Sequence, residues 1–280
     1  MLLRGIVMAA MLLGAIVGLP LGIFESADWL WAYPLLALGF FVLELVLAFV
    51  YLLIVCKGVD MDAEQEIDDP RYRKIVELYA DSIIPMVRVN IITKGLNKVP
   101  KEGRFLLVCN HLNDSDPALL LHFFRNSQLA FISKKENSTM FIVGKIMHKI
   151  LCQMINREND REALKTILKC IQLIKDDEVS VAVFPEGGIK ENNLLNPFRP
   201  GVFKIAQKAN VPIVVCTLWG SQNVFKNFAK LKPTDVDLHL VGVIPAEELK
   251  GVTAVDISNR VHAMMAADLG EERVYHEQNT

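Results

Sequence analysis

The chain has 280 residues, 52% of them hydrophobic, and a formal net charge of −2. This length allows one large domain or two small ones. Outside residues 1–56 the basic and acidic residues are equal in number, which disfavours a general nucleic-acid surface. The five cysteines form no C-x-x-C pair and are expected to be buried thiols in a reducing compartment.

Two apolar runs at the N-terminus predict a membrane hairpin. Residues 5–24 contain no charged residue, and residues 30–56 contain only Glu44. Each run is long enough to cross a bilayer as a helix. We expect residues 1–58 to form a two-helix anchor, although the pattern does not distinguish a hairpin that spans the bilayer from one that enters a single leaflet.

The charges around this hairpin predict its orientation. The connector between the runs is acidic and flanked by tryptophans, whereas Arg4 precedes the first run and Lys57 follows the second. The positive-inside rule therefore places both ends on the cytoplasmic side. We expect residues 59–280 to form one membrane-held domain on the cytoplasmic face.

The remaining elements alternate between strand and helix patterns. Asp69 and Pro70 form an N-cap and first-position pair for one helix. Further helices are expected after Pro117 and at residues 141–154, 160–175, 200–210 and 255–269, and strands at 87–92, 104–109, 129–133, 179–184, 211–218 and 236–244. This order predicts an α/β sandwich with a largely parallel central sheet and flanking helices.

The most informative segment is residues 110–117, Asn-His-Leu-Asn-Asp-Ser-Asp-Pro. On one continuous helix, His111 and Asp116 would point about 140° apart, so they can meet only if the chain bends. Asp116 as an N-cap and Pro117 as the first helical residue would supply that bend. A histidine on a turn beside a carboxylate can activate a hydroxyl as a general base.

Other chemistries lack their sequence patterns. The six histidines are scattered without H-x-x-x-H spacing, so no metal site is expected. No G-x-S-x-G nucleophile elbow and no G-x-x-x-x-G-K-[ST] phosphate loop is present. What remains is a His/Asp pair that deprotonates a substrate hydroxyl, without a residue placed to form a covalent intermediate.

A second motif suggests a family. Asn110-His111 with Asp116, followed by Phe184-Pro185-Glu186-Gly187, resembles the glycerolipid acyltransferase family, whose best-known members are the lysophosphatidic acid acyltransferases. Supporting matches lie at residues 155–157, 197–201 and 211–214, so the resemblance covers about residues 85–220.

The resemblance implies acyl transfer from acyl-CoA or acyl-carrier protein to the free hydroxyl of a lysophospholipid. Lysophosphatidic acid, giving phosphatidic acid, is the first expected acceptor. His111 would take the hydroxyl proton, and Asp116 would fix the imidazole tautomer, as an aspartate does in a Ser-His-Asp triad. The thioester is a co-substrate, and no other cofactor is implied.

The same resemblance assigns residues to substrate binding. Arg157 corresponds to a position for the acceptor phosphate, because a guanidinium can bind phosphate bidentately; a plain surface cation at a helix start is the equal alternative. Glu186, Gly187 and Gly188 match the acceptor loop, and the remaining candidates are Asn110, Arg199 and Lys190.

One departure from the family concerns this loop. The family sequence usually continues Glu-Gly-Thr-Arg-Ser, whereas here Gly187 is followed by Gly188, Ile189 and Lys190. Ile189 thus stands where an arginine is expected, and Lys190 could replace that arginine as a point charge.

Three alternatives stay open on the sequence. The acceptor could be glycerol-3-phosphate or another lysolipid. In another enzyme class, the same pair could act on water in a membrane-bound thioesterase or hydrolase. A lipid-binding protein with a decayed site is the non-enzymatic alternative.

Overall fold

The computed structural model describes residues 2–27 and 29–276. By internal contacts the chain divides into two units, Met1–Ala63 and Glu64–Thr280. Each unit is described by itself.

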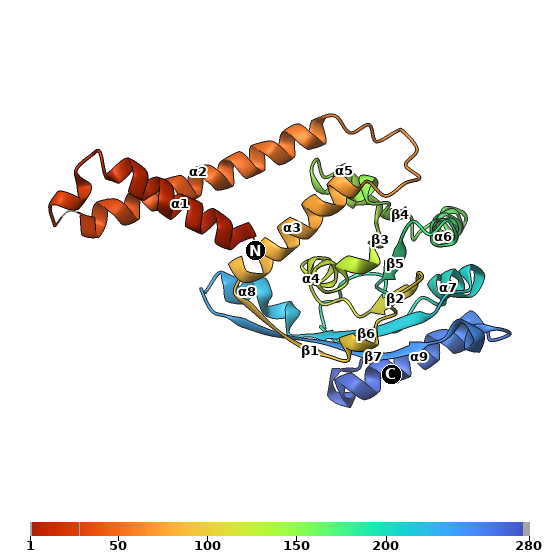
Figure 1. Ribbon diagram of the computed structural model, residues 1–280. Helices are drawn as coiled ribbons and strands as arrows, with labels where there is room; N and C mark the ends of the chain where they lie inside the picture. Colours follow the sequence, from red (N-terminus) through yellow and green to blue (C-terminus); the bar gives the residue numbers. More distant parts are fainter. Residues whose placement is uncertain (1, 28, 277–280) are drawn as a thin grey trace. The chain divides into compact units, whose positions relative to one another are not determined.

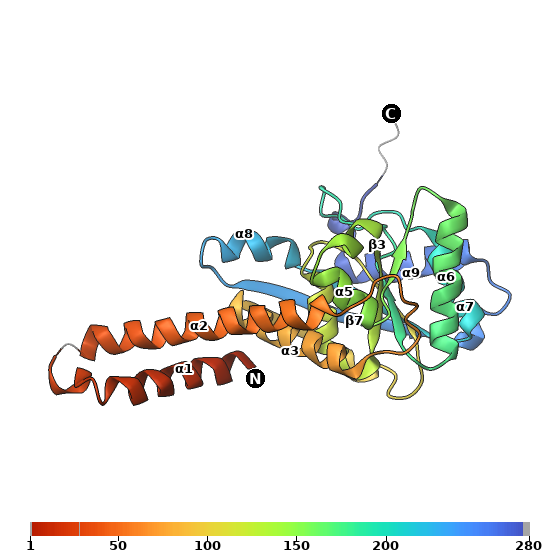
Figure 2. The ribbon, with the colours of Figure 1, turned by 90° about the horizontal axis from the view of Figure 1, so that it is seen from above.

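The first unit is a helical hairpin. Helices α1 (Leu2–Gly18) and α2 (Trp29–Lys57) are connected through a short 3-10 helix, Ile23–Glu25, and run side by side (Figures 1 and 2). Gly14 faces Ala37 so closely that a Cβ on Gly14 would lie 3.3 Å from the Ala37 Cα. Small residues at this position let the two helices approach.

The two helices differ in their ability to cross a bilayer. Among the described residues, α2 is the one helix both long and apolar enough for a span. The first apolar run forms a helix only as far as Gly18, and 17 residues rise about 25 Å, short of the roughly 30 Å hydrocarbon core. Pro20 lacks the N–H that would continue the helical hydrogen bonding. The helix of the first run is therefore shorter than the 20-residue apolar run in the sequence.

The second unit is built on a mixed sheet of seven strands. Their order is β1-β7-β6-β2-β5-β3-β4, and every neighbouring pair is parallel except β6 with β7. The strands are β1 Val89–Lys94, β2 Leu106–Cys109, β3 Leu129–Lys134, β4 Gln153–Ile155, β5 Ser180–Val183, β6 Ile213–Trp219 and β7 Thr234–Ile244. The largely parallel α/β sandwich predicted from the sequence is confirmed.

Helices cover both faces of the sheet, and α4 and α9 lie on opposite sides of it (Figure 1). On β2, Leu106 and Val108 join one core cluster with residues of α6, α7 and α9, and Leu107 between them is equally buried but points to the other face. The helices are α3 Pro70–Met86, α4 Asp116–Phe123, α5 Val143–Lys149, α6 Asp160–Lys175, α7 Lys204–Ala209, α8 Val224–Phe228 and α9 Ala254–Leu269.

One predicted helix is wrong over part of its length. Residues 141–154 form only the short helix α5, after which the chain turns through Leu151 (φ 64°) and enters strand β4. A short apolar run does not by itself separate a buried helix from a buried strand.

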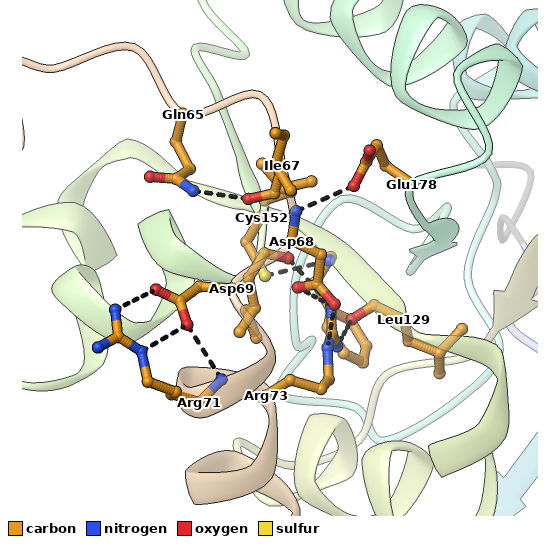
Figure 3. Close-up of polar contacts among 12 residues, drawn as sticks. Gln65, Ile67, Asp68, Asp69, Arg71, Arg73, Leu129, Cys152 and Glu178 are labelled. Carbon is orange, nitrogen blue, oxygen red and sulfur yellow. Dashed lines mark hydrogen bonds and ion pairs between the residues drawn. The ribbon is translucent and has the colours of Figure 1, made fainter.

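A buried ion pair holds the beginning of α3 (Figure 3). The Arg73 guanidinium donates to both carboxylate oxygens of Asp68, at 3.0 and 2.8 Å, and to the carbonyls of Leu129 and Ile150. Asp69 is the N-cap of α3, and its side chain accepts the N–H of Arg71 at 3.0 Å, as predicted. The first turn of α3 is thus tied to β3 and to the end of α5.

Candidate active site

The predicted site residues lie at one edge of the sheet. Strands β2, β3, β4, β5 and β6 run in the same direction, so their carboxyl ends meet at this edge. His111 follows β2, Phe184 and Glu186 follow β5, and Arg157 follows β4. Ligands of open α/β sheets bind outside the carboxyl ends of the strands.

His111 and Asp116 form the pair predicted from their spacing. The His111 Nδ1 lies 2.9 Å from the Asp116 Oδ2, which also accepts the backbone N–H groups of Leu112 at 2.7 Å and Asn113 at 2.8 Å. The carboxylate is fully buried, whereas the histidine side chain is 14% exposed. Because a carboxylate accepts hydrogen bonds, Nδ1 carries the proton and Nε2 is left to accept one.

The bend between these residues differs from the prediction in one respect. Ser115, not Asp116, is the N-cap of α4, and Asp116 is the first residue of the helix, with Pro117 second. The Asp116 carboxylate points back to the 111–113 turn and satisfies that turn's N–H groups instead of those of its own helix.

Phe184 fixes the plane of the imidazole. The His111 and Phe184 rings stack with centroids 4.0 Å apart and an interplanar angle of 14°. Phe131 stacks in turn on Phe184 at 6.0 Å. Sequence reasoning treated Phe184 only as part of a strand and a motif; its position as the first residue after β5, beside β2, was the available signal.

Glu186 links the two motifs. Its Oε1 accepts the backbone N–H of His111 at 2.9 Å, and its Oε2 accepts the N–H of Asn196 at 2.9 Å. The side chain is buried, and burial raises the pKa of the Glu186 carboxyl against the lowering effect of these bonds. The carboxylate is therefore committed to holding two loops together, a role that the prediction of substrate binding did not foresee. Asn196 was likewise missed.

Asn110 also acts within the protein. Its Oδ1 accepts the N–H of Leu218 at 2.7 Å, and its Nδ2 donates to the Leu218 carbonyl at 2.9 Å. The side chain, only 1% exposed, thus continues the pairing of β2 with β6 one residue beyond the strand. Both polar atoms of the predicted substrate-binding residue are thus engaged with Leu218.

Two arginines lie against the glycine loop. Gly187 (φ 79°) and Gly188 (φ 143°) adopt backbone conformations that favour glycine. A Cβ on Gly187 would lie 2.8 Å from the Arg199 Nε, and one on Gly188 would lie 3.3 Å from the Arg157 Nη1. A side chain at Gly187 would displace the Arg199 guanidinium, and one at Gly188 would crowd the Arg157 guanidinium.

These arginines are electrostatically unfavourable neighbours. Arg157 donates to the Gly187 carbonyl, and its pKa is lowered first by burial and then by the charge of Arg199. The Arg199 guanidinium forms no hydrogen bond or ion pair with a described residue, and Lys134 adds a third cation near Gly188. Cations packed together in this way can bind an anion such as phosphate.

An apolar cavity of about 390 Å³ adjoins this cluster. Phe184 lines the cavity and also stacks on His111, so it connects the cavity to the catalytic pair. The polar side chains of the lining are Arg157, Asp160, Arg199 and Lys204, and the hydrophobic side chains are Ile132, Ile155, Ala163, Leu164, Ile167, Val183, Phe184, Pro185 and Val202. Such a lining suits an amphiphile with an anionic end.

Lys190 lies apart from Arg157. It lines a larger cavity of about 640 Å³ together with Glu186, Glu191, Asn196 and Arg199. Phe184 lines only the smaller cavity, Glu186 lines only the larger one, and His111 lines neither. The described residues contain no group of three or more His, Cys, Asp or Glu side chains placed to hold a metal ion.

Comparison with known proteins identifies the class. A family model described as Acyltransferase matches residues 90–219, which contain the pair, the glycine loop and both arginines. This match supports the resemblance to the glycerolipid acyltransferase family that the sequence motifs indicated, and the chain is an enzyme of acyl transfer.

Individual relatives share this assignment. A probable 1-acyl-sn-glycerol-3-phosphate acyltransferase of Mycoplasma pneumoniae is 29% identical over 206 residues, covering 72% of this chain and 74% of the relative. The chloroplastic 1-acyl-sn-glycerol-3-phosphate acyltransferase BAT2 of Brassica napus is 31% identical over 161 residues, 55% of this chain and 45% of that protein. The crystal structure of PlsC from Thermotoga maritima has the same fold, with a TM-score of 0.61 at 19% identity over 81% of this chain and 89% of that chain.

Proposed function

We propose that the enzyme transfers an acyl group from acyl-CoA or acyl-carrier protein to the free hydroxyl of lysophosphatidic acid, giving phosphatidic acid. The observation that carries the proposal is the packing of Arg157 and Arg199 on the glycine loop, beside an apolar cavity whose wall residue Phe184 stacks on His111. Lysophosphatidic acid carries a phosphate monoester, which suits the two arginines, and an acyl chain, which suits the apolar cavity. The relatives named 1-acyl-sn-glycerol-3-phosphate acyltransferases support the same acceptor.

The His/Asp pair carries out proton transfer. The Nε2 of His111 takes the proton from the acceptor hydroxyl while that oxygen attacks the thioester carbonyl. When the tetrahedral intermediate collapses, the carbon–sulfur bond breaks and the imidazolium returns the proton to the departing thiolate. Asp116 stabilises the imidazolium, and positioned proton transfer of this kind contributes about 10²–10⁴-fold. No acyl-enzyme forms.

The acceptor phosphate is held by two arginines from different elements. Arg157 comes from the end of β4, and Arg199 comes from the segment before α7. In the family loop an arginine stands at the position of Ile189. Here Arg199, from another part of the chain, provides a cation beside the loop instead. Its guanidinium needs no movement of the loop because Gly187 leaves it room.

The membrane delivers the acceptor. Apolar N-terminal helices associate the chain with a membrane, and the anchor over residues 1–58 would keep the domain of residues 59–280 at the surface. The basic residues Arg4 and Lys57 support a cytoplasmic location of the catalytic domain. Both substrates then reach the same face, the thioester from solution and the lysolipid from the bilayer.

An acceptor panel tests the proposal. The full-length enzyme in mixed micelles is given acyl-CoA or acyl-carrier protein with lysophosphatidic acid, lysophosphatidylcholine, glycerol-3-phosphate or no acceptor, and products are identified by mass. We expect phosphatidic acid from lysophosphatidic acid and no product with His111→Ala. Thiol release at an equal rate without acceptor would instead identify a hydrolase, and lipid binding without turnover would identify a binding protein.

A further inference from the structure

The segment after β6 exposes an unusual set of side chains. Phe225, Phe228 and Leu231 are 53%, 41% and 73% exposed, and the lysines between and after them are exposed as well. We call these six residues the α8 patch: Phe225, Lys226, Phe228, Lys230, Leu231 and Lys232. The patch therefore presents large apolar groups and cations together on one short stretch of chain.

The backbone under the patch is firmly held. Val224 is buried, the Asn227 Nδ2 donates to the Thr234 Oγ1 at 3.1 Å, and the Lys232 N–H donates to the Asn227 carbonyl at 2.9 Å. Arg88 donates to the Leu231 carbonyl, which ties the patch to the start of β1 (Figure 1). Leu231 has a φ of 56°, a conformation that is uncommon for a branched side chain. The exposure thus belongs to an ordered structure.

The charge of the patch is not neutralised from within the unit. None of the three lysines forms an ion pair with a described residue, and residues 220–234 contain no acid. The nearest acid along the chain, Asp235, accepts a hydrogen bond from Asn90 at 3.0 Å. A partner that complements the patch would be both apolar and anionic. Aromatic and aliphatic side chains among lysines are typical of segments that bind at the interface of anionic bilayers.

The patch lies at the same edge of the sheet as the catalytic pair. β6 runs parallel to β2, with Cys216 opposite Cys109, so α8 follows β6 at the edge where His111 follows β2. We propose that the α8 patch is a membrane-contact surface of the catalytic unit, with Phe225, Phe228 and Leu231 in the interface of an anionic bilayer and the lysines at the lipid phosphates. This contact turns the active-site edge toward the lipid. The proposal does not depend on which lysolipid is the acceptor.

Site-specific labelling tests the contact in the full-length enzyme. All five native cysteines are buried, so a cysteine introduced by Phe228→Cys can be labelled selectively with an environment-sensitive dye. Val255→Cys is the matched control, because Val255 is 53% exposed on the first turn of α9, which follows β7, a strand that runs opposite to β6. The labelled proteins are placed in nanodiscs of phosphatidylcholine with or without phosphatidylglycerol.

We expect spin-labelled acyl chains to quench the dye at position 228 severalfold more than at 255, and aqueous iodide to show the reverse. Replacing the lysines in the variant Lys226→Gln/Lys230→Gln/Lys232→Gln should reduce lipid quenching in anionic nanodiscs to its value in neutral ones. Equal iodide quenching at both positions would overturn the proposal. Shielding from iodide without lipid quenching would also overturn it, because a protein segment would then cover the patch. Leu231→Cys provides a second labelling position if Phe228→Cys does not fold.

Discussion

The Oε1 of Glu186 accepts the backbone N–H of His111 at 2.9 Å, across 75 positions of sequence. Through this bond the second motif holds the catalytic turn of the first. The other carboxylate oxygen accepts the N–H of Asn196, so one buried side chain joins three loop segments. The conformation of the proposed general base therefore depends on a residue that does not itself need to touch a substrate.

Replacing Glu186 should separate this positioning role from substrate binding. In Glu186→Gln one oxygen becomes an amide NH₂, which must face either the His111 or the Asn196 N–H, so one of the two bonds is lost. We expect unfolding to become easier by about 1–3 kcal/mol and kcat to fall, with little change in KM. Melting midpoints and initial rates measure both effects, with the exposed neighbour Glu191→Gln as control. A rise in KM alone would contradict the positioning role.

The raised pKa of Glu186 adds a dependence on pH. Its folded-state pKa lies above the ordinary 4.5, so the folded protein binds this proton more tightly than the unfolded chain. The contribution of this proton to the stability of the fold is complete below about pH 4.5, and it is lost as the pH rises through the folded-state pKa of Glu186. We therefore expect the difference in melting midpoint between the wild type and Glu186→Gln to be larger at pH 4.5 than at pH 7.5. Far-UV circular dichroism can report unfolding at both pH values, and the opposite trend would show that burial does not dominate the pKa of this carboxyl.

Asp116→Asn should remove charge while keeping geometry. The amide oxygen can take the place of Oδ2 and still accept the three N–H groups, one from the imidazole and two from the backbone of the turn. The NH₂ group then takes the place of Oδ1, which has no hydrogen-bond partner among the described residues. We expect kcat to fall by about 10²-fold or more, with a melting midpoint close to that of the wild type. Activity above a tenth of wild type would show that the carboxylate charge is not needed.

Arg199→Ala should weaken binding of an anionic acceptor. A hydrogen bond to a charged group contributes about 1.5–3 kcal/mol, so we expect KM for lysophosphatidic acid to rise by about ten- to a hundredfold. Arg199→Lys should have an intermediate effect because an ammonium keeps the charge but not the planar fork. The exposed Arg161→Ala on α6 is the matched control. If Arg199→Ala and Arg161→Ala raise the KM for lysophosphatidic acid equally, Arg199 does not bind the acceptor phosphate.

The buried Arg73 should be needed for stability but not for chemistry. Arg73→Met leaves the Asp68 carboxylate buried without its partner, and such a loss costs about 3–5 kcal/mol. Arg71→Met, two residues earlier and with 84% of its side chain exposed, should change stability by less than about 0.5 kcal/mol (Figure 3). Adding Asp68→Leu to Arg73→Met should recover part of the loss. Thermal denaturation of the three variants measures these differences.

Elements with a strong periodic pattern could be predicted from the sequence. Helix α6 lies over Asp160–Lys175 as its amphipathic pattern indicated, and the His111 and Asp116 pair could be inferred because both residues lie on one turn. Local spacing determines features of this kind. Strand β4 has only three residues, too few for a pattern to distinguish it from the end of a helix.

Contacts that depend on strand order could not be predicted in the same way. Glu186 reaches His111 only because β5 lies beside β2, and Asn110 reaches Leu218 only because β6 lies on the other side. The role of Asp116 could not be resolved either, because a carboxylate at a helix start can serve its own helix or the preceding turn, and the choice depends on the tertiary position of His111.

The central place of β2 has a consequence for how the enzyme is made. The strand that carries His111 is enclosed by β5 and β6, which end 74 and 110 positions after it, at Val183 and Trp219. A growing chain emerges N-terminus first, at roughly 5–20 residues per second. The apolar hairpin is therefore available to a membrane while β2 still lacks both neighbours. The enzyme should reach its membrane as an incomplete, inactive chain, and the catalytic centre should assemble there rather than in solution.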